Sequence, residues 1–305
     1  MKIIKDVGII GAGPAGMSAA LYLARSKYSF LLIEKEMSGG KLNITTQIEN
    51  YPGVGSIDGF TLGMNMKNQL KSFNISIKKD NCIDVKKVDE GFEVIGEKDT
   101  YLFKILIIAT GSKTKGSGIK NEEKYYGKGI SFCAVCDGFL YKNKDVAVFA
   151  SSRKGYLEAL YLANIVNKVY LINDNNSDDE EDNLAKLKSL NNVEFLYPFK
   201  IKQYIGEERI SGVEIENINT KETKIIDISC VFPFIGDQPS TYFLSKLGVE
   251  TNKGYIITNK FMETNIKNCL AIGDVIDKPL RQVVTACSDG SIAATRAIHI
   301  LNGMK

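Results

Sequence analysis

Apolar and amphipathic stretches alternate along the chain in the manner of strands and helices. Twice, an apolar strand pattern ends in a turn of small residues, a helical pattern follows, and a second strand pattern closes the unit. The first unit spans residues 3–33 and the second spans residues 145–172. Such units build parallel sheets, so we expect an α/β protein. The two units begin roughly 140 residues apart, which favours a duplicated domain architecture over an array of short repeats.

The turn of the first unit has the spacing of a dinucleotide-binding loop. Gly11, Gly13 and Gly16 follow a strand and open a helix, and Glu34 ends the next strand. The glycines permit a tight turn, close approach of the backbone to a pyrophosphate and close helix–strand packing. The helix N-terminus would then face the phosphates, and the Glu34 carboxylate would bind ribose hydroxyls. We therefore expect a bound dinucleotide.

Composition narrows the class of function. A net charge of +3 gives no support to a nucleic-acid or membrane role. No apolar run approaches the ~20 residues of a membrane span, and a strand pattern that begins at Ile3 leaves no room for a signal peptide. Six cysteines are too sparse for a disulfide scaffold in 305 residues. We expect a cytoplasmic protein whose cysteines matter chemically.

Two later segments point to the identity of the dinucleotide. Residues 107–111 (Ile-Ile-Ala-Thr-Gly) and 270–274 (Leu-Ala-Ile-Gly-Asp) resemble elements of FAD-dependent pyridine nucleotide-disulfide oxidoreductases. In that family the Gly-Asp pair, here Gly273 and Asp274, holds the ribityl and pyrophosphate portion of the flavin. Because such motifs lie near both ends of the chain, we expect a second domain inserted into an FAD domain.

The Cys133-Ala-Val-Cys136 motif is the most informative stretch. A CxxC pair is half a zinc site, a dithiol centre or a chance occurrence. Zinc would need two further ligands, but the other cysteines are scattered singly and His299 is the one histidine. We therefore expect no metal. Beside a flavin, a dithiol can carry two electrons to a partner disulfide, and Asp137 is the natural proton donor.

The whole chain resembles the low-molecular-weight thioredoxin reductases. The segments that carry the resemblance are Cys133–Lys142, Gly40–Leu42, Thr45–Gly53 and Arg281–Ala286. The resemblance implies that Cys136 lies next to the flavin, that Cys133 attacks thioredoxin and that Asp137 is the acid. It also implies a homodimer.

The expected FAD-binding residues combine these motifs. They are Gly11, Gly13, Pro14, Ala15, Gly16, Glu34, Lys35, Gly40, Lys41, Leu42, Thr46, Asn50, Ala109, Thr110, Gly111, Gly273, Asp274, Arg281, Gln282 and Val283. The fold expected is two Rossmann-like, three-layer ββα domains. Residues 1–114 and 242–305 would form the FAD domain, and residues 115–241 the inserted NAD(P)H-type domain with the CxxC motif.

The second nucleotide loop departs from the family pattern. Residues 150–155 read Ala-Ser-Ser-Arg-Lys-Gly, so only Gly155 remains, and the missing glycines place Cβ atoms where a pyrophosphate would approach. Six acids and no base stand in residues 173–182, where the family has a basic cluster. They would repel a 2′-phosphate by roughly 1–4 kcal/mol per close pair. Asp174 could bind the 2′-hydroxyl of NADH, but the altered loop argues against it.

Loss of the nicotinamide site would require another electron donor. The chain resembles a pyridine nucleotide-independent branch of the family in which ferredoxin reduces the flavin. Electrons passing from about −400 mV to thioredoxin at about −270 mV release about 6 kcal/mol per pair. Residues 101–154 carry ten Lys/Arg against four Asp/Glu, an excess that could steer an acidic ferredoxin. The lysines concerned are Lys113, Lys115, Lys120, Lys124, Lys128, Lys142 and Lys144.

Three alternatives stay open at this stage. The chain could be an NADPH- or NADH-dependent thioredoxin reductase with a diverged loop. A second flavin or another nucleotide could occupy the altered site, as in a diflavin disulfide oxidoreductase. The chain could also be a flavin redox sensor without turnover, although a sensor need not retain Asp137.

Overall fold

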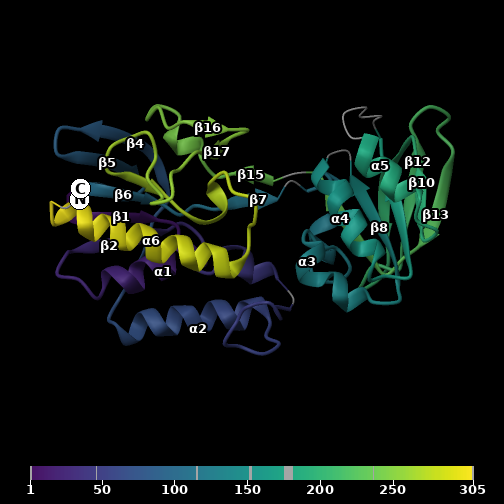
Figure 1. The fold of residues 1–305 in the computed structure, drawn as a ribbon, viewed down its shortest axis with the longest axis horizontal. Coiled ribbons are helices and arrows are strands. Elements are labelled where there is room, and N and C mark those ends of the chain that lie inside the picture. Colours follow the sequence, from purple (N-terminus) through teal and green to yellow (C-terminus); the bar gives the residue numbers. More distant parts are fainter. Residues whose placement is uncertain are drawn as a thin grey trace. The chain divides into compact units, whose positions relative to one another are not determined.

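The computed structural model describes residues 2–45, 47–114, 116–150, 153–174, 181–235 and 237–303. The chain divides into two compact units, drawn as a ribbon in Figure 1. Unit 1 comprises residues 1–45, 51–113 and 238–305, and unit 2 comprises residues 46–50 and 114–237. Assignment of these units to an FAD domain and a nicotinamide-type domain stays a prediction.

Unit 1 contains a seven-stranded sheet within the described residues. The strand order is β3-β2-β1-β6-β5-β4, and β18 also pairs with β6. The pairs among β3, β2, β1, β6 and β18 are parallel, whereas β4 and β5 are antiparallel additions. The strands are β1 (Lys2–Ile10), β2 (Phe30–Glu34), β3 (Ile77–Lys79), β4 (Cys82–Val88), β5 (Gly91–Gly96), β6 (Thr100–Ile108) and β18 (Cys269–Ala271).

The parallel strands bring loops that are far apart in sequence to one sheet edge. Ile10 of β1 pairs with Ile33 of β2 and with Ile108 of β6, and Ile108 pairs with Ala271 of β18. All four strands therefore end at the same level. The loops that follow them carry most of the expected cofactor-binding residues. There are also two short two-stranded sheets: β16 (Thr251–Asn252) with β17 (Tyr255–Ile256) in unit 1, and β7 (Ser112–Thr114) with β15 (Asp237–Pro239), whose strands include the unit boundaries at residues 113–114 and 237–238.

Helices α1 (Pro14–Leu23) and α6 (Val283–Leu301) lie side by side in unit 1 (Figure 1). A glycine explains their close approach: a Cβ at Gly290 would lie 2.9 Å from the backbone nitrogen of Ala19. Helix α2 (Gly59–Ser72) begins after Asp58, whose carboxylate accepts a hydrogen bond from the Thr61 N–H at 2.8 Å. This is an ordinary N-cap, which satisfies a backbone donor that the helix leaves unpaired.

Unit 2 has three layers. A parallel sheet of order β10-β9-β8-β14 lies between helices and an antiparallel sheet of order β11-β12-β13. Val146 and Val148 of β8 face a core with helix α4, whereas Ala147 faces a second core with the antiparallel sheet. The elements are α3 (Ala134–Asp137), β8 (Asp145–Ala150), α4 (Arg153–Ala163), β9 (Lys168–Ile172), α5 (Glu181–Lys188), β10 (Val193–Leu196), β11 (Phe199–Ile205), β12 (Gly212–Asn217), β13 (Thr223–Asp227) and β14 (Cys230–Phe234).

The predicted fold class is confirmed: both strand–turn–helix–strand units lie in parallel sheets, and unit 2 has the ββα layering. Successive side chains of β8 point to opposite faces of the sheet. Both faces are apolar because each one covers a different core. None of the described helices has the length and apolar character that crossing a membrane requires.

Candidate functional site

The glycine loop, residues 11–16, is shaped by contacts that only glycine permits. Gly11 has φ +108°, and a Cβ there would strike the carbonyl of Ala109. A Cβ at Gly16 would strike the carbonyl of Gly11. In contrast, a Cβ at Gly13 would meet no atom within 4 Å. Gly11 and Gly16 are therefore required by packing, and Gly13 leaves open space beside the start of α1.

The N-terminus of α1 lacks a side-chain cap. Its N-cap residue is Gly13, which has no side chain, and Pro14 occupies the first turn without an N–H group. The uncapped backbone N–H groups of the first turn carry partial positive charge. Together with the open space at Gly13, this arrangement suits an anion such as a phosphate.

Glu34 supports the glycine loop directly. Its two carboxylate oxygens accept hydrogen bonds from the backbone N–H of Ala12, at 2.7 Å, and of Glu36, at 3.0 Å. A carboxylate has about four acceptor sites, so each oxygen keeps capacity for a further donor. From the sequence, Glu34 was expected to bind ribose hydroxyls. Its hydrogen bond to the Ala12 N–H, which supports the glycine loop, was not predicted.

Lys41 links two segments that the sequence assigned to the same cofactor. Its Nζ lies 2.8 Å from Ser112 Oγ and 3.7 Å from a carboxylate oxygen of Asp274. Lys41 belongs to the short 3-10 helix Gly40–Ile44, and a Cβ at Gly40 would lie 3.5 Å from the Cα of Gly13. Gly40 therefore lies beside the glycine loop, and Lys41 joins the Gly40–Ile44 helix to Asp274. The family resemblance is what assigned these three residues to one cofactor.

A buried ion pair fixes the loop that carries Asp274. Lys278 Nζ lies 2.6 Å from an Asp289 carboxylate oxygen, and both side chains are about nine-tenths buried. The same Asp289 oxygen accepts the Gly273 N–H at 3.0 Å. Since Asp289 is on α6, it ties the end of β18 to that helix. Neither residue could be identified from the sequence, because neither stands in a recognisable motif.

Arg281 and Gln282 bind their own loop. The Arg281 guanidinium donates to the carbonyls of Asp274, at 3.4 Å, and Ile276, at 2.9 Å, and lies 3.9 Å from the ring centre of Tyr255. Gln282 is the N-cap of α6 and forms a capping box with Thr285. Val283 is the first residue of that helix. These contacts shape the loop.

The other expected cofactor residues vary in setting. Thr110 Oγ1 donates to the carbonyl of Ser240 at 2.8 Å, and Gly111 has φ +64° with open space where a Cβ would lie. Ala109 and Leu42 are buried. Pro14 and Ala15 begin α1, and Lys35 Nζ lies 3.4 Å from Glu36. Thr46 is outside the described residues, and Asn50 belongs to unit 2.

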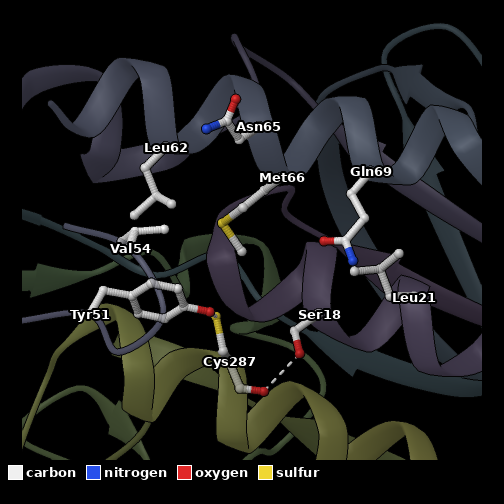
Figure 2. Close-up of a pocket in the computed structure, with 9 residues that line it drawn as sticks. All are labelled: Ser18, Leu21, Tyr51, Val54, Leu62, Asn65, Met66, Gln69 and Cys287. Carbon is white, nitrogen blue, oxygen red and sulfur yellow. Dashed lines mark hydrogen bonds between the residues drawn. The ribbon is translucent and has the colours of Figure 1, made fainter. Parts of the chain in front are cut away.

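Unit 1 also contains a pocket of about 250 Å³ that no expected site residue lines. Figure 2 shows Tyr51, Met66 and Cys287 around it, with the Ser18 hydroxyl donating to the Cys287 carbonyl at 2.8 Å. Burial raises the pKa of Tyr51 to about 12, and its hydroxyl lies 3.8 Å from Cys287 Sγ. Cys287 is only partly buried, whereas Cys82, Cys230 and Cys269 are buried.

The cysteine motif lies in unit 2, beside the edge of the parallel sheet. Cys133 is disulfide-bonded, whereas Cys82, Cys230, Cys269 and Cys287 are free thiols. The side chain of Cys136 is outside the described part of the structure. The backbone N–H of Asp137 donates to the carbonyl of Cys133 at 3.1 Å, which closes the single turn of α3. The segment therefore holds Cys133 and Asp137 close together.

Asp137 is a buried carboxyl with few partners. It is 8% exposed, and Ser131 Oγ lies 2.6 Å from its Oδ2. Its Oδ1 has no hydrogen-bond partner among the described residues. Burial raises the pKa of Asp137 above the ordinary value, and the hydrogen bond from Ser131 offsets part of that rise. A carboxyl in this setting holds its proton more tightly than an exposed carboxyl does and is suited to exchange it with a neighbouring group.

Large apolar side chains stand exposed next to the cysteine motif. Val135, Phe139 and Leu140 are 43%, 62% and 41% exposed. They come from α3 and the 3-10 helix Gly138–Tyr141 that follows it. Exposed aromatic and aliphatic groups that stand together on a surface are typical of a site that receives a protein partner.

The second nucleotide loop retains its packing glycine. A Cβ at Gly155 would strike the side chain of Ala150 and would lie 3.3 Å from Phe234 Cβ. At the end of β9, the Asn173 amide donates to the buried Tyr156 hydroxyl at 2.7 Å. The predictions for residues 151–152 and 175–180 lie outside the described residues. The described part of this region keeps the close helix–strand packing of a nucleotide-binding fold, and the Asn173 side chain binds Tyr156 of α4.

Geometric clusters that could hold a metal ion are absent: within the described residues, no three His, Cys, Asp or Glu side chains gather closely enough.

Comparisons with known proteins extend along the whole chain. The family described as pyridine nucleotide-disulphide oxidoreductase matches residues 5–290. A protein named thioredoxin reductase from Mycoplasma pneumoniae is 39% identical over 303 residues, covering 98% of this chain and 96% of the relative. The crystal structure of thioredoxin reductase from Streptococcus pyogenes is 35% identical, with a TM-score of 0.94 over 99% of both chains. The crystal structure of a ferredoxin-flavin thioredoxin reductase from Clostridium acetobutylicum is 27% identical, with a TM-score of 0.56 over 99% of this chain and 100% of the other.

Proposed function

Because the chain belongs to the pyridine nucleotide-disulphide oxidoreductase family, we propose that it is a flavin-dependent reductase of protein disulfides that acts on thioredoxin or a thioredoxin-like protein. The observation that carries this proposal is the disulfide-bonded Cys133 beside the buried, hydrogen-bonded Asp137. Chain-long similarity to proteins named thioredoxin reductase supports the choice of partner.

The proposed cofactor is FAD, and the loops of unit 1 fit it. The open space at Gly13 and the uncapped N-terminus of α1 suit the pyrophosphate, and Glu34 keeps acceptor capacity for ribose hydroxyls. Lys41 and Asp274 would lie along the same molecule. When bound, the flavin would supply the electron pair that opens the disulfide. All the residues that are named in the sequence analysis as expected to bind FAD, the first of which is Gly11 and the last Val283, keep that proposed role.

The dithiol would carry the electron pair to the partner. Two electrons break the S–S bond of the CxxC pair and leave two sulfur anions, which take up two protons in the fully reduced form. The Cys133 thiolate then attacks the partner disulfide, a mixed disulfide forms and a partner thiolate leaves. Attack by Cys136 on the mixed disulfide releases the reduced partner and restores the starting pair. Asp137 would exchange one proton with the sulfurs.

We further propose that the electron donor is a ferredoxin, with two one-electron transfers for each disulfide reduced. Ala150 stands where a first loop glycine is expected, and the Asn173 amide binds Tyr156. Lys120, Lys124, Lys128, Lys142 and Lys144 are exposed in unit 2 and would attract an acidic partner. The similarity to a ferredoxin-flavin thioredoxin reductase supports this donor. NADPH or NADH is the competing donor, since unit 2 keeps the β8–α4–β9 arrangement and the packing of Gly155.

Anaerobic reduction of the purified protein tests the donor. NADPH, NADH and reduced ferredoxin are offered separately, with thioredoxin as the acceptor, and the flavin absorbance band is followed. We expect bleaching by ferredoxin alone, at a rate that falls as salt is added. The double variant Lys142→Glu/Lys144→Glu should be slower with ferredoxin, whereas the exposed control Lys186→Glu should not. Rapid bleaching by NADPH would overturn the proposed donor and leave the disulfide reductase intact.

The exposed apolar group beside the cysteines predicts a docking effect. We expect Phe139→Ser to raise KM for thioredoxin about tenfold, because a lost anchor worth about 1.4 kcal/mol weakens binding by that factor. Turnover of a small disulfide such as dithionitrobenzoate should be unchanged. Ile225 is the matched control, since it is 66% exposed on β13 of the same unit. Equal KM values for Phe139→Ser and Ile225→Ser would place the docking surface elsewhere.

A further inference from the structure

We propose that Ser131 is a positioning residue that holds the Asp137 carboxyl in both of its protonation states. This inference rests on the proposed function, in which Asp137 exchanges a proton with the dithiol. Ser131 touches neither the expected flavin nor the partner in that scheme. It acts through Asp137 alone.

Ser131 is fixed in place by the sheet of unit 2. Its backbone N–H donates to the carbonyl of Val231 at 3.1 Å, and the N–H of Val231 donates to the carbonyl of Gly129 at 2.8 Å. Val231 belongs to β14, which pairs in parallel with β8. Ser131 itself is 5% exposed. Its hydroxyl therefore projects from a rigid, buried edge of the sheet.

One hydroxyl reaches three groups of the cysteine segment. Ser131 Oγ lies 2.6 Å from Asp137 Oδ2, 3.2 Å from the Cys133 backbone nitrogen and 3.4 Å from the Cys133 carbonyl oxygen. The Cys133 N–H can donate only to the hydroxyl oxygen. The hydroxyl proton, in contrast, has two acceptors available, the carboxylate and the carbonyl.

These distances serve both forms of Asp137. When the carboxylate is ionised, the Ser131 hydroxyl donates to Oδ2. When Oδ2 carries the proton, the carboxyl donates to Ser131 Oγ, and the hydroxyl proton can turn to the Cys133 carbonyl. Asp137 thus gains or loses its proton without leaving a hydrogen bond to Ser131 unmade. A buried unmade bond would oppose one of the two states.

The rest of the surroundings does not replace this contact. Asp137 Oδ1 has no partner among the described residues. The titratable neighbours whose charges interact with the cluster are Tyr141 of the following 3-10 helix, Cys230 of β14 and Arg209. Burial raises the pKa values of both Tyr141 and Cys230, so both are neutral near pH 7. Removing the Ser131 hydroxyl would leave the ionised carboxylate without a described donor, which favours the protonated form.

The test compares wild type with Ser131→Ala, Ser131→Thr and Asp137→Asn. The holoenzyme is reduced, freed of reductant and treated with iodoacetamide across a range of pH, and mass spectrometry gives the alkylation rate at Cys133. Because iodoacetamide reacts with the thiolate, every variant shows the inflection of the Cys133 thiol itself. We expect in wild type a second inflection, from Asp137, that is missing in Asp137→Asn. It should move upward by about one pH unit in Ser131→Ala, because a hydrogen bond to a charged group is lost. Ser131→Thr keeps the hydroxyl and should restore the wild-type profile.

Several outcomes would overturn this positioning role. One is an unmoved inflection in a folded Ser131→Ala variant, even if the rate falls at every pH. Another is a second inflection, besides that of the Cys133 thiol, that persists in Asp137→Asn. If Ser131→Ala does not fold, failure of a folded Ser131→Thr to reproduce the wild-type inflection decides against the proposal. Turnover of thioredoxin is measured in parallel. If the alkylation profiles are as expected but the protein reduces no disulfide, the proposed function is refuted and the Ser131 role stands.

Discussion

A Cys133→Ser variant is expected to retain its flavin and its bleaching by the donor, but to lose thioredoxin reduction by about 10³-fold or more. Serine cannot form the disulfide that accepts the electron pair, and its hydroxyl is a poor nucleophile at neutral pH. The loops proposed to bind the cofactor belong to unit 1, apart from Thr46 and Asn50, whereas Cys133 belongs to unit 2. Flavin content measured by absorbance should therefore be unchanged, while steady-state thioredoxin reduction collapses.

Two further variants sharpen this test. Cys136→Ser leaves the Cys133 thiolate able to attack a partner disulfide but removes the thiol that releases the partner, so a covalent complex should accumulate on a non-reducing gel. Cys82→Ala is the matched control, because Cys82 is a buried free thiol of unit 1 whose pKa is raised by burial to about 12. It should turn over normally. Normal turnover by Cys133→Ser would refute the dithiol mechanism. A Cys133→Ser variant that reduces no thioredoxin but still serves the cell normally would revive the flavin redox sensor.

The sequence predicted the parts of the fold that depend on local pattern. Gly11 and Gly16 mark places where one backbone segment approaches another closely. A Cβ at Gly11 would strike the Ala109 carbonyl, and a Cβ at Gly16 would strike the Gly11 carbonyl. The parallel units were predictable for the same reason, since apolar strands buried on both faces leave a strong pattern. Gly155 kept its packing role even where the rest of its loop changed.

The sequence could not predict contacts between side chains that tertiary folding brings together. Lys278 and Asp289 are ordinary charged residues in sequence, and only the packing of α6 against the loop that contains Gly273 and Lys278 makes them a buried pair. Arg281 keeps its proposed place at the cofactor, but no motif indicates that its guanidinium also binds loop carbonyls and lies over the Tyr255 ring. Ser131 lies six residues before Asp137, but no propensity indicates that its hydroxyl meets that carboxyl.

The buried carboxyl also predicts a conflict between activity and stability. We expect Asp137→Asn to lower disulfide turnover by about 10²–10⁴-fold, because an amide cannot exchange a proton with the sulfurs. The same change should raise thermal stability at neutral and alkaline pH. The wild-type carboxyl must otherwise ionise in a site where burial opposes its charge and Oδ1 has no described partner.

The pH dependence gives the sign of this stability effect. Because the folded-state pKa of Asp137 is raised above the ordinary value of 3.8, the folded protein binds the proton more tightly than the unfolded chain does. Its contribution to stability is complete below about pH 4 and is lost as pH rises through the folded-state pKa. The Tm advantage of Asp137→Asn should therefore be small in acid and should grow toward pH 8. Asp227→Asn, an exposed carboxyl on β13, should show no such trend. A Tm difference independent of pH would mean that Asp137 does not ionise in an unfavourable site, and its assignment as the proton donor would lose its physical basis.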